Sequence, residues 1–202
     1  MLNLEVPLTT IIAVASFAYL LGSIPFGMVI AKIMGLGNLR AIGSGNIGAT
    51  NVLRTGNKLA AFLTLVFDMG KGAVAVLLAS TFFGQTAAEI AGLFAFLGHL
   101  YPVWLKFKGG KGVAVFLGIL LATAPFAGIA ACLTWLATAL AIRISSASAL
   151  VASLLAPLWL YLIDVKSGVF FVIIMALLIW VKHKENIKRI IKGTEPKIGK
   201  RG

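Results

Sequence analysis

Residues 113–142 read VAVFLGILLATAPFAGIAACLTWLATALAI and contain no charged side chain. The run is longer than the roughly 20 residues that one transmembrane helix needs. Pro125 stands near its middle. Proline removes a helical hydrogen bond and disfavours helix in the residue before it. The run is therefore either one long membrane pass or a hairpin of two short passes that turns near Pro125.

The composition of the whole chain agrees with a membrane setting. Apolar residues make up 60% of the 202 residues, and the mean hydropathy is +1.02. A soluble domain of this length could not hide that much apolar surface from water. The single Cys132 lies within an apolar run, so neither a disulfide nor a cysteine metal site is predicted. We expect an all-α integral membrane protein with one domain over residues 1–202.

The charges indicate how many times the chain crosses. The chain has 18 Lys and Arg against six acids, and its other apolar runs cover 8–34, 59–83, 87–105, 147–163 and 168–181. With seven passes the basic segments 35–58, 106–112, Arg143 and the tail 183–202 share one side. The other side then keeps Lys166, with Glu5, Glu89 and Asp164 nearby. With six passes the tail would lie opposite the other basic segments.

The positive-inside rule favours seven passes, with the N-terminus outside and the C-terminus in the cytoplasm of a bacterial inner membrane. No cleavable signal peptide is expected, since Glu5 is the only charge in the first residues and the run after it is long enough to span. The segment 113–124 is short for a span, which suits a helix that lines a cavity within the protein.

Two patterns within the first two apolar runs are predicted to serve helix packing and charge neutralisation, not catalysis. Ser23, Gly27, Ala31 and Gly35 recur every four residues in the first run, a pattern typical of close helix packing. Asp68 and Lys71 lie three apart in the second run, so they are expected to neutralise each other.

The polar loop 43–54, GSGNIGATNVLR, carries the strongest chemical signal. It satisfies the G-x-G-x-x-G pattern, but no strand precedes it, which excludes a dinucleotide-binding fold. Clustered N–H donors, hydroxyls, amides and a guanidinium suit a phosphate, whereas a plain connector would not need them. The predicted phosphate-binding residues of this loop are Gly43, Ser44, Gly45, Asn46, Gly48, Thr50, Asn51 and Arg54.

Three further clusters fall on the same side in the seven-pass arrangement. Lys111 lies between Gly110 and Gly112 where an apolar helix begins, which predicts an anion site at a helix N-terminus. A Walker A loop is excluded, because Gly112 stands at the position after the lysine where that motif needs Ser or Thr. Ser145 and Ser148 start another helix and are either helix caps or phosphate ligands. His183 and Asn186 lie three apart, so both side chains can point into the bundle.

Across these motifs the chain resembles the acyl-phosphate:glycerol 3-phosphate acyltransferase family, the bacterial PlsY enzymes. The resemblance covers nearly the whole chain. It rests on GSIPFG at 22–27, the loop 43–54, DMGKG at 68–72, residues 98–112 and HKENI at 183–187. Asn38 is a departure, because the family usually has aspartate there. The chain also lacks the His-x4-Asp box of coenzyme A-dependent acyltransferases.

The resemblance implies transfer of a fatty acyl group from acyl phosphate to the 1-hydroxyl of glycerol 3-phosphate. The products would be lysophosphatidic acid and inorganic phosphate, at the entry to bacterial phospholipid synthesis. No metal, cofactor, nucleic acid or obligate protein partner is expected. The residues that the resemblance assigns to the substrate phosphates are Ser44, Thr50, Arg54, Lys111, Ser148, His183 and Asn186.

Two questions stay open in the sequence. His183 could act as general base, or a substrate phosphate with a second pKa of about 6 could take the hydroxyl proton itself, as the family is thought to do. The competing function is a transporter or channel for phosphorylated anions. Transporters usually place polar groups near the midplane within repeated halves, whereas the polar clusters here gather at one end of the spans and no repeat is visible.

Overall fold

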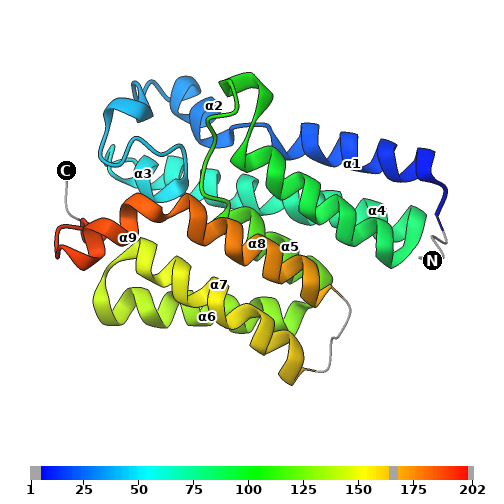
Figure 1. The fold of residues 1–202 in the computed structure, drawn as a ribbon. Coiled ribbons are helices and arrows are strands. Elements are labelled where there is room, and N and C mark those ends of the chain that lie inside the picture. Colours follow the sequence, from blue (N-terminus) through cyan, green and yellow to red (C-terminus); the bar gives the residue numbers. More distant parts are fainter. Residues whose placement is uncertain (1–5, 164–167, 200–202) are drawn as a thin grey trace.

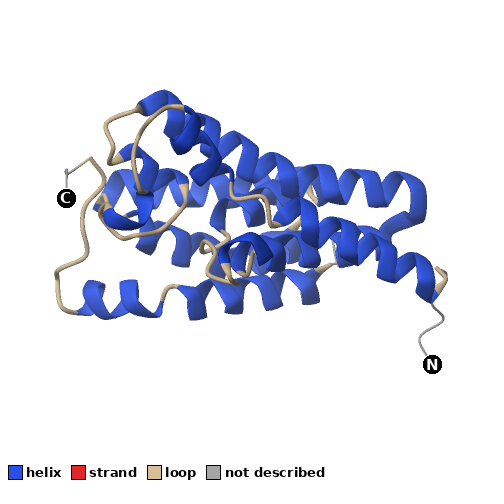
Figure 2. Cartoon of the chain, turned by 90° about the horizontal axis from the view of Figure 1, so that it is seen from above, coloured by secondary structure: helices blue, strands red, loops and turns tan. Residues whose placement is uncertain are grey.

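The computed structural model describes residues 6–163 and 168–199, which form helices and connecting loops without any strand (Figures 1 and 2). Glu5, Asp164 and Lys166, which entered the charge argument, lie outside these residues. The helices are α1 (Leu8–Gly22), α2 (Phe26–Ile33), α3 (Ala49–Leu53), α4 (Lys58–Leu100), α5 (Val113–Thr123), α6 (Pro125–Ile142), α7 (Ser145–Leu162), α8 (Val169–Lys182) and α9 (Lys184–Ile191). Short 3-10 turns cover Leu39–Ala41 and Val103–Leu105.

The turn predicted at Pro125 is confirmed. Helix α5 ends at Thr123, and α6 begins at Pro125, the first helical position, where a missing N–H costs nothing. An ideal Cβ on Gly128 would lie 2.6 Å from the backbone nitrogen of Leu121. The two helices therefore run side by side from the turn with backbones almost in contact.

Helix α4 reverses direction at Gly84, between the predicted runs 59–83 and 87–105. Gly84 has φ 81° and ψ −174°, a conformation that glycine adopts without a Cβ penalty. Beyond the turn the halves pack together, because an ideal Cβ on Gly92 would lie 3.2 Å from Val76 Cγ2. Counting both halves with α1 and α5 to α8, the described residues contain seven apolar helical segments, as predicted.

The first apolar run, predicted as one helix over 8–34, is broken. Helix α1 ends at Gly22 and α2 begins after Pro25, which has no N–H to continue the helical ladder. The small-residue stripe is split by this break. Ser23 is fully buried, and an ideal Cβ on Gly27 would lie 1.9 Å from the carbonyl oxygen of Ile47. Gly35 has no atom within 4 Å of its ideal Cβ. Part of the stripe thus supports the 43–48 loop instead of another helix.

The exterior of the bundle is apolar along its length. Within residues 6–163 and 168–199, four helical stretches are long and apolar enough to cross a membrane: Leu8–Ile33, Lys58–Leu105, Pro125–Ile142 and Ser145–Leu162. Helices α5 and α8 are apolar but shorter. Phe82, Phe126 and Leu140 expose 70%, 74% and 73% of their surface. Such exposure is tolerated where lipid, not water, covers the protein.

The main buried cluster lies between α4, α5, α6, α7 and α8. Its fully buried side chains include Phe96, Phe116, Leu120, Leu160 and Met175. Glycines bring the helices close: an ideal Cβ on Gly118 would lie 2.1 Å from the carbonyl oxygen of Met69. Short α5 is therefore enclosed by protein, which removes the difficulty of a span of only 11 residues.

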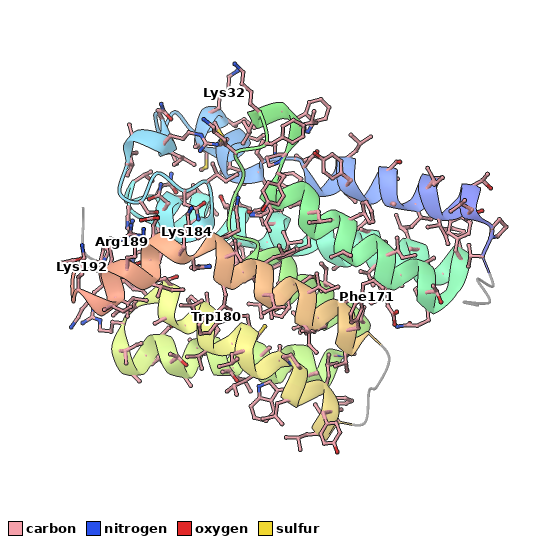
Figure 3. The ribbon with its side chains drawn as sticks, in the orientation of Figure 1. Lys32, Phe171, Trp180, Lys184, Arg189 and Lys192 are labelled. Carbon is pink, nitrogen blue, oxygen red and sulfur yellow. The ribbon has the colours of Figure 1, made fainter. Side chains whose placement is uncertain are left out.

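The basic connections gather at one end of the bundle, opposite the reversal within α4 and the turn between α5 and α6 (Figure 1). Thr50 Oγ1 lies 3.0 Å from Ser145 Oγ, and the N–H of Ile198 donates to the carbonyl of Arg143 at 2.7 Å. Figure 3 shows Lys184 and Arg189 of α9, and Lys192 directly after it, at this end. This grouping requires an even number of passes between the first loop and the tail, and the two halves of α4 with α5 to α8 supply six, as in the predicted seven-pass arrangement.

Candidate active site

A cavity of about 710 Å³ opens at the basic end of the bundle. Its polar part is built from the loop before α3, α3 itself, the loop before α5, the start of α7, and α9 with the tail. The side chains and backbone that line this part belong to Ser44, Asn46, Gly48, Thr50, Asn51, Arg54, Lys58, Lys111, Ser145, Ser146, His183, Asn186 and Glu195.

The cavity continues between the helices as an apolar flank. Its walls come from the first half of α4, α5, α6 and α7, through Phe62, Leu65, Met69, Val113, Ala114, Leu117, Cys132, Trp135 and Ala149. Phe62 and Leu65 expose 59% and 40% of their surface, so the flank reaches the apolar exterior. One cavity therefore joins a charged, hydrogen-bonding end to a surface suited to a hydrocarbon chain.

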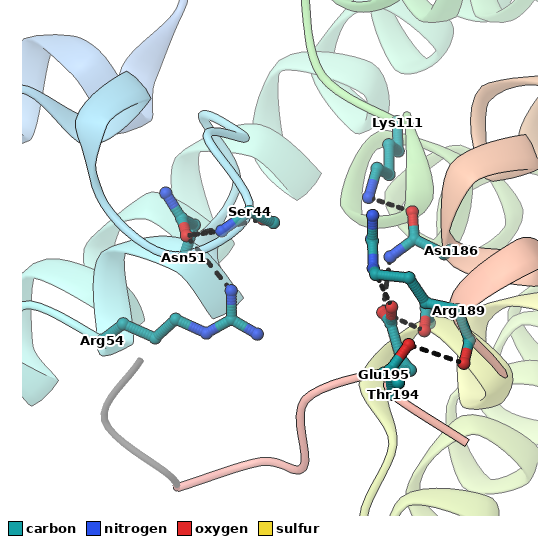
Figure 4. A network of polar contacts seen from close by, with 9 residues as sticks. Ser44, Asn51, Arg54, Lys111, Asn186, Arg189, Thr194 and Glu195 are labelled. Atoms are coloured by element: carbon teal, nitrogen blue, oxygen red, sulfur yellow. Dashed lines mark hydrogen bonds and ion pairs between the residues drawn. The ribbon is translucent and has the colours of Figure 1, made fainter. Parts of the chain in front are cut away.

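Asn51 organises the 43–54 loop. Its buried amide donates from Nδ2 to the carbonyl of Leu39 at 2.8 Å, and its Oδ1 accepts from the N–H of Ser44 at 3.1 Å and from Arg54 Nη1 at 3.4 Å (Figure 4). Gly43 has φ 53°, and an ideal Cβ there would lie 2.6 Å from Arg54 Cδ. A glycine at position 43 is therefore required for the Arg54 side chain to occupy this position.

The backbone N–H groups of this loop are less available than the sequence indicates. The N–H of Gly45 donates to the carbonyl of Ile42 at 2.9 Å, and that of Ser44 is bound by Asn51. The loop therefore presents its anion-binding capacity mainly through Arg54 and the hydroxyls of Ser44 and Thr50.

Lys111 lies on the other side of the cavity, just before α5. Its Nζ donates to Asn186 Oδ1 at 2.5 Å. Burial lowers the pKa of Lys111 to about 8, and the nearby cations Arg189, Arg54 and Lys182 act in the same direction while Glu195 opposes them. An ammonium with this pKa is charged at neutral pH and available to a phosphate.

His183 occupies the junction of α8 and α9 and exposes 3% of its surface. Its Nδ1 lies 2.8 Å from the carbonyl oxygen of Ile179, an acceptor, so Nδ1 carries the proton and Nε2 keeps a lone pair. Burial, together with the charge of Lys111, lowers the pKa of His183 to about 4. The ring is neutral near pH 7 and accepts a hydrogen bond at Nε2.

Glu195, in the tail after α9, is a site residue that the motifs missed, as are Lys58 and Ser146. Its Oε1 accepts from Ser146 Oγ at 2.7 Å and Asn186 Nδ2 at 2.5 Å, and its Oε2 accepts from Arg189 Nε at 2.6 Å (Figure 4). Burial opposes ionisation, but these hydrogen bonds together with the charge of Arg189 outweigh it and lower the pKa of Glu195. The only sequence signal was an acid within a basic tail.

The structure brings most of the predicted site residues to one cavity. Ser148 is not among its lining residues: the hydroxyl is buried and donates to the carbonyl of Ile144 at 2.9 Å, which ties it to its own helix. Gly43, Gly45 and Gly110, which were also predicted to bind phosphate, are not lining residues either, and their ideal Cβ positions fall close to Arg54, Arg40 and His99 respectively. Over residues 6–163 and 168–199, no group of three His, Cys, Asp or Glu side chains could hold a metal ion.

Comparison with known proteins identifies the family of the chain. The profile of the glycerol-3-phosphate acyltransferase family matches residues 12–193. Two relatives named glycerol-3-phosphate acyltransferase come from Jannaschia sp. (strain CCS1) and Roseobacter denitrificans. The first is 61% identical over 186 residues, 92% of each chain, and the second is 63% identical over 183 residues, 91% of this chain and 92% of the relative.

The fold is also similar to crystal structures of PlsY (YgiH), an integral membrane glycerol 3-phosphate acyltransferase. Its glycerol 3-phosphate form has a TM-score of 0.89 and 40% identity, covering 94% of this chain and 96% of that chain. Its lysophosphatidic acid form has a TM-score of 0.88 and 39% identity with the same coverage. The chain described here belongs to the glycerol-3-phosphate acyltransferase family and is an integral membrane acyltransferase.

Proposed function

We propose that the enzyme transfers a fatty acyl group from acyl phosphate to the 1-hydroxyl of glycerol 3-phosphate, at the cytoplasmic face of a bacterial inner membrane. The observation that carries the proposal is the single cavity in which Arg54 and Lys111 share the polar end and an apolar flank leads to the exterior. Both substrates carry a phosphate, and one of them also carries a long acyl chain.

Acyl transfer in this cavity needs no covalent enzyme intermediate. The hydroxyl oxygen attacks the acyl carbonyl carbon, the bond from that carbon to the phosphate oxygen breaks, and phosphate leaves with the bonding electrons. The hydroxyl proton ends on phosphate, giving lysophosphatidic acid and inorganic phosphate. Lys111 and Arg54 orient the two anions and stabilise the charge that develops on the leaving phosphate.

A substrate phosphate is the better base for the hydroxyl proton. Its second pKa is about 6, whereas the pKa of His183 is about 4. The imidazole would thus be about a hundredfold weaker as a base. In the proposed reaction His183 Nε2 accepts a hydrogen bond from the glycerol moiety and orients it, while phosphate takes the proton. Ser44, Thr50 and Ser145 complete the phosphate site, with Asn46 and the Gly48 backbone beside them.

Orientation in the membrane follows from charge. The basic end faces the cytoplasm, where anionic lipid and the soluble substrate are both found, and α9 lies along the interface. Residues 1–202 act as a single domain. The reaction as proposed uses no metal, cofactor, nucleic acid or second protein.

The test uses purified protein in detergent, acyl phosphate and radiolabelled glycerol 3-phosphate. Labelled lysophosphatidic acid should form, with one phosphate released for each acyl group transferred. An acyl-coenzyme A of the same chain length is the matched donor and should give no product. Product from the coenzyme A donor alone would overturn the donor assignment. Vesicle uptake of labelled glycerol 3-phosphate without acylation would instead support a transporter.

A further inference from the structure

A cluster of ionisable side chains lies inside the bundle, beneath the loop that carries Lys111, and no step above uses it. Asp68 and Lys71 come from the first half of α4 and His99 from the second half, and they expose 2%, 3% and 5% of their surface. Asp68 and His99 also border the cavity. Pairing of Asp68 with Lys71 would by itself offset the free-energy cost of placing these two charges within a membrane. The histidine therefore calls for a separate explanation.

Lys71 joins three segments of the chain. Its Nζ lies 2.8 Å from Asp68 Oδ1, donates to the carbonyl of Ile24 at 2.8 Å, and lies 3.0 Å from His99 Nδ1. Ile24 stands at the break between α1 and α2. Asp68 Oδ1 has no regular hydrogen bond within the described part of the chain, so its stabilisation comes from the ion pair.

These contacts fix the tautomer of His99. A lysine ammonium has hydrogens to donate and no lone pair, so Nδ1 of the ring must be the acceptor. The ring proton then resides on Nε2. His183 has the opposite arrangement, because its Nδ1 faces a carbonyl oxygen. The two histidines of the chain are thus held in opposite tautomers.

The glycine loop before α5 packs directly on His99. The N–H of Gly110 donates to the carbonyl of His99 at 3.1 Å, and the N–H of Gly109 donates to the carbonyl of Leu100 at 3.2 Å. An ideal Cβ on Gly110 would lie 2.2 Å from His99 Nε2, and one on Gly109 would lie 2.1 Å from the His99 carbonyl oxygen. The loop has no room to shift toward the ring, and Lys111 is the next residue.

We propose that Lys71 and His99 are positioning residues for phosphate binding. Lys71 holds the imidazole in the Nε2–H tautomer, and the fixed ring is the platform on which Gly110 rests, so that Lys111 reaches the polar end of the cavity. Asp68 holds the ammonium in place. The inference rests on the proposed role of Lys111 in binding glycerol 3-phosphate.

The first test is the tautomer itself, which is independent of turnover. Protein labelled with 15N-histidine contains two imidazoles, and a His183→Gln variant assigns them. The wild-type His99 spectrum should show a protonated Nε2 and an unprotonated Nδ1, and Lys71→Met should change that pattern. A wild-type spectrum with the proton on Nδ1 would overturn the proposal.

The second test is a double-mutant cycle. Lys71→Met should raise the KM for glycerol 3-phosphate about tenfold with a much smaller change in kcat, because loss of one buried partner displaces the loop. His99→Gln can place an amide N–H near the position of Nε2. It should therefore raise the KM for glycerol 3-phosphate less than Lys71→Met does. Ser153→Ala is the matched control, since Ser153 exposes 1% and bonds only its own helix.

The cycle separates two kinds of failure. If Lys71 acts through Lys111, the Lys71→Met and Lys111→Ala variants should not be additive in KM. Additive effects would disprove the positioning role while leaving the site assignment intact. A normal KM in Lys111→Ala alone would instead refute the proposed role of Lys111. Should Lys71→Met not fold, the double variant Asp68→Asn/Lys71→Met, which removes both buried charges, replaces it in the cycle, with thermal unfolding measured for each variant.

Discussion

Lys111 and Asn186 are joined by a hydrogen bond of 2.5 Å across 75 positions of sequence, from Nζ to Oδ1. The contact ties the loop before α5 to α9. The same amide donates from Nδ2 to Glu195 Oε1, which leaves Asn186 with one possible orientation. The polar end of the cavity is therefore closed by an ordered chain from Lys111 through Asn186 to the tail, not by isolated basic residues.

The first prediction concerns pH. Because the pKa of Lys111 is about 8, its ammonium is present below that pH and lost above it. The affinity for glycerol 3-phosphate should fall as pH rises through about 8, visible as a rise in KM. Lys111→Arg should move this limb to higher pH, since a guanidinium stays charged. An unchanged alkaline limb in Lys111→Arg would show that another group controls it.

Glu195 should stabilise the fold in a pH-dependent way. Hydrogen bonds lower its folded pKa, so the ionised carboxylate stabilises the native state above its ordinary pKa of 4.5, and the effect is lost as pH falls through the folded pKa. Glu195→Gln should therefore lower the midpoint of thermal unfolding by more at pH 7 than at pH 3, because pH 3 lies below the ordinary pKa of 4.5. Glu185→Gln is the control, because the Glu185 side chain is 57% exposed. Equal losses at both pH values would contradict this account.

Gly43 should be needed for the placement of Arg54. In Gly43→Ala the new Cβ would meet Arg54 Cδ at 2.6 Å, so the guanidinium must move. The KM for glycerol 3-phosphate should rise about tenfold, as expected for a displaced charged ligand. Gly35→Ala is the control. Gly35 has a similar positive φ, 64° against 53° for Gly43, but an ideal Cβ on Gly35 would have no atom within 4 Å. This control variant should lose similar thermal stability with an unchanged KM.

Much of this architecture could be read from the sequence because membranes impose simple rules. Hydropathy and the position of Pro125 located seven segments, and charge parity placed the basic loops together. The break at Pro25 was missed because membrane helices often contain proline without ending there. The sequence could not show that Ser145 lines the cavity and Ser148 does not. The two serines lie in the same turn region of α7, and only the orientation of the helix decides whether a hydroxyl faces the cavity or bonds its own helix.

Residues that act through others were the hardest to predict. Glu195 looked like one acid among the charges of the tail, and its role depends on the tail folding back to Ser146. The expected pairing of Asp68 with Lys71 is confirmed, since Lys71 Nζ lies 2.8 Å from Asp68 Oδ1. Their link to His99 depends on the reversal at Gly84, which brings residues 28 positions apart into contact. Such contacts arise from tertiary packing, so a linear motif does not contain them.

The last prediction distinguishes the two possible bases. With a pKa of about 4 and its Nδ1 proton engaged by Ile179, His183 offers a lone pair for orientation and is a poor proton acceptor. His183→Ala should therefore keep measurable kcat while the KM for glycerol 3-phosphate rises. His183→Gln, which can place an amide oxygen near Nε2, should recover much of the affinity. If His183→Ala bound glycerol 3-phosphate normally yet lost the chemical step completely, the imidazole would be the base. The acidic limb of kcat gives a second readout: it should persist in His183→Gln, because the titrating group is then the substrate phosphate.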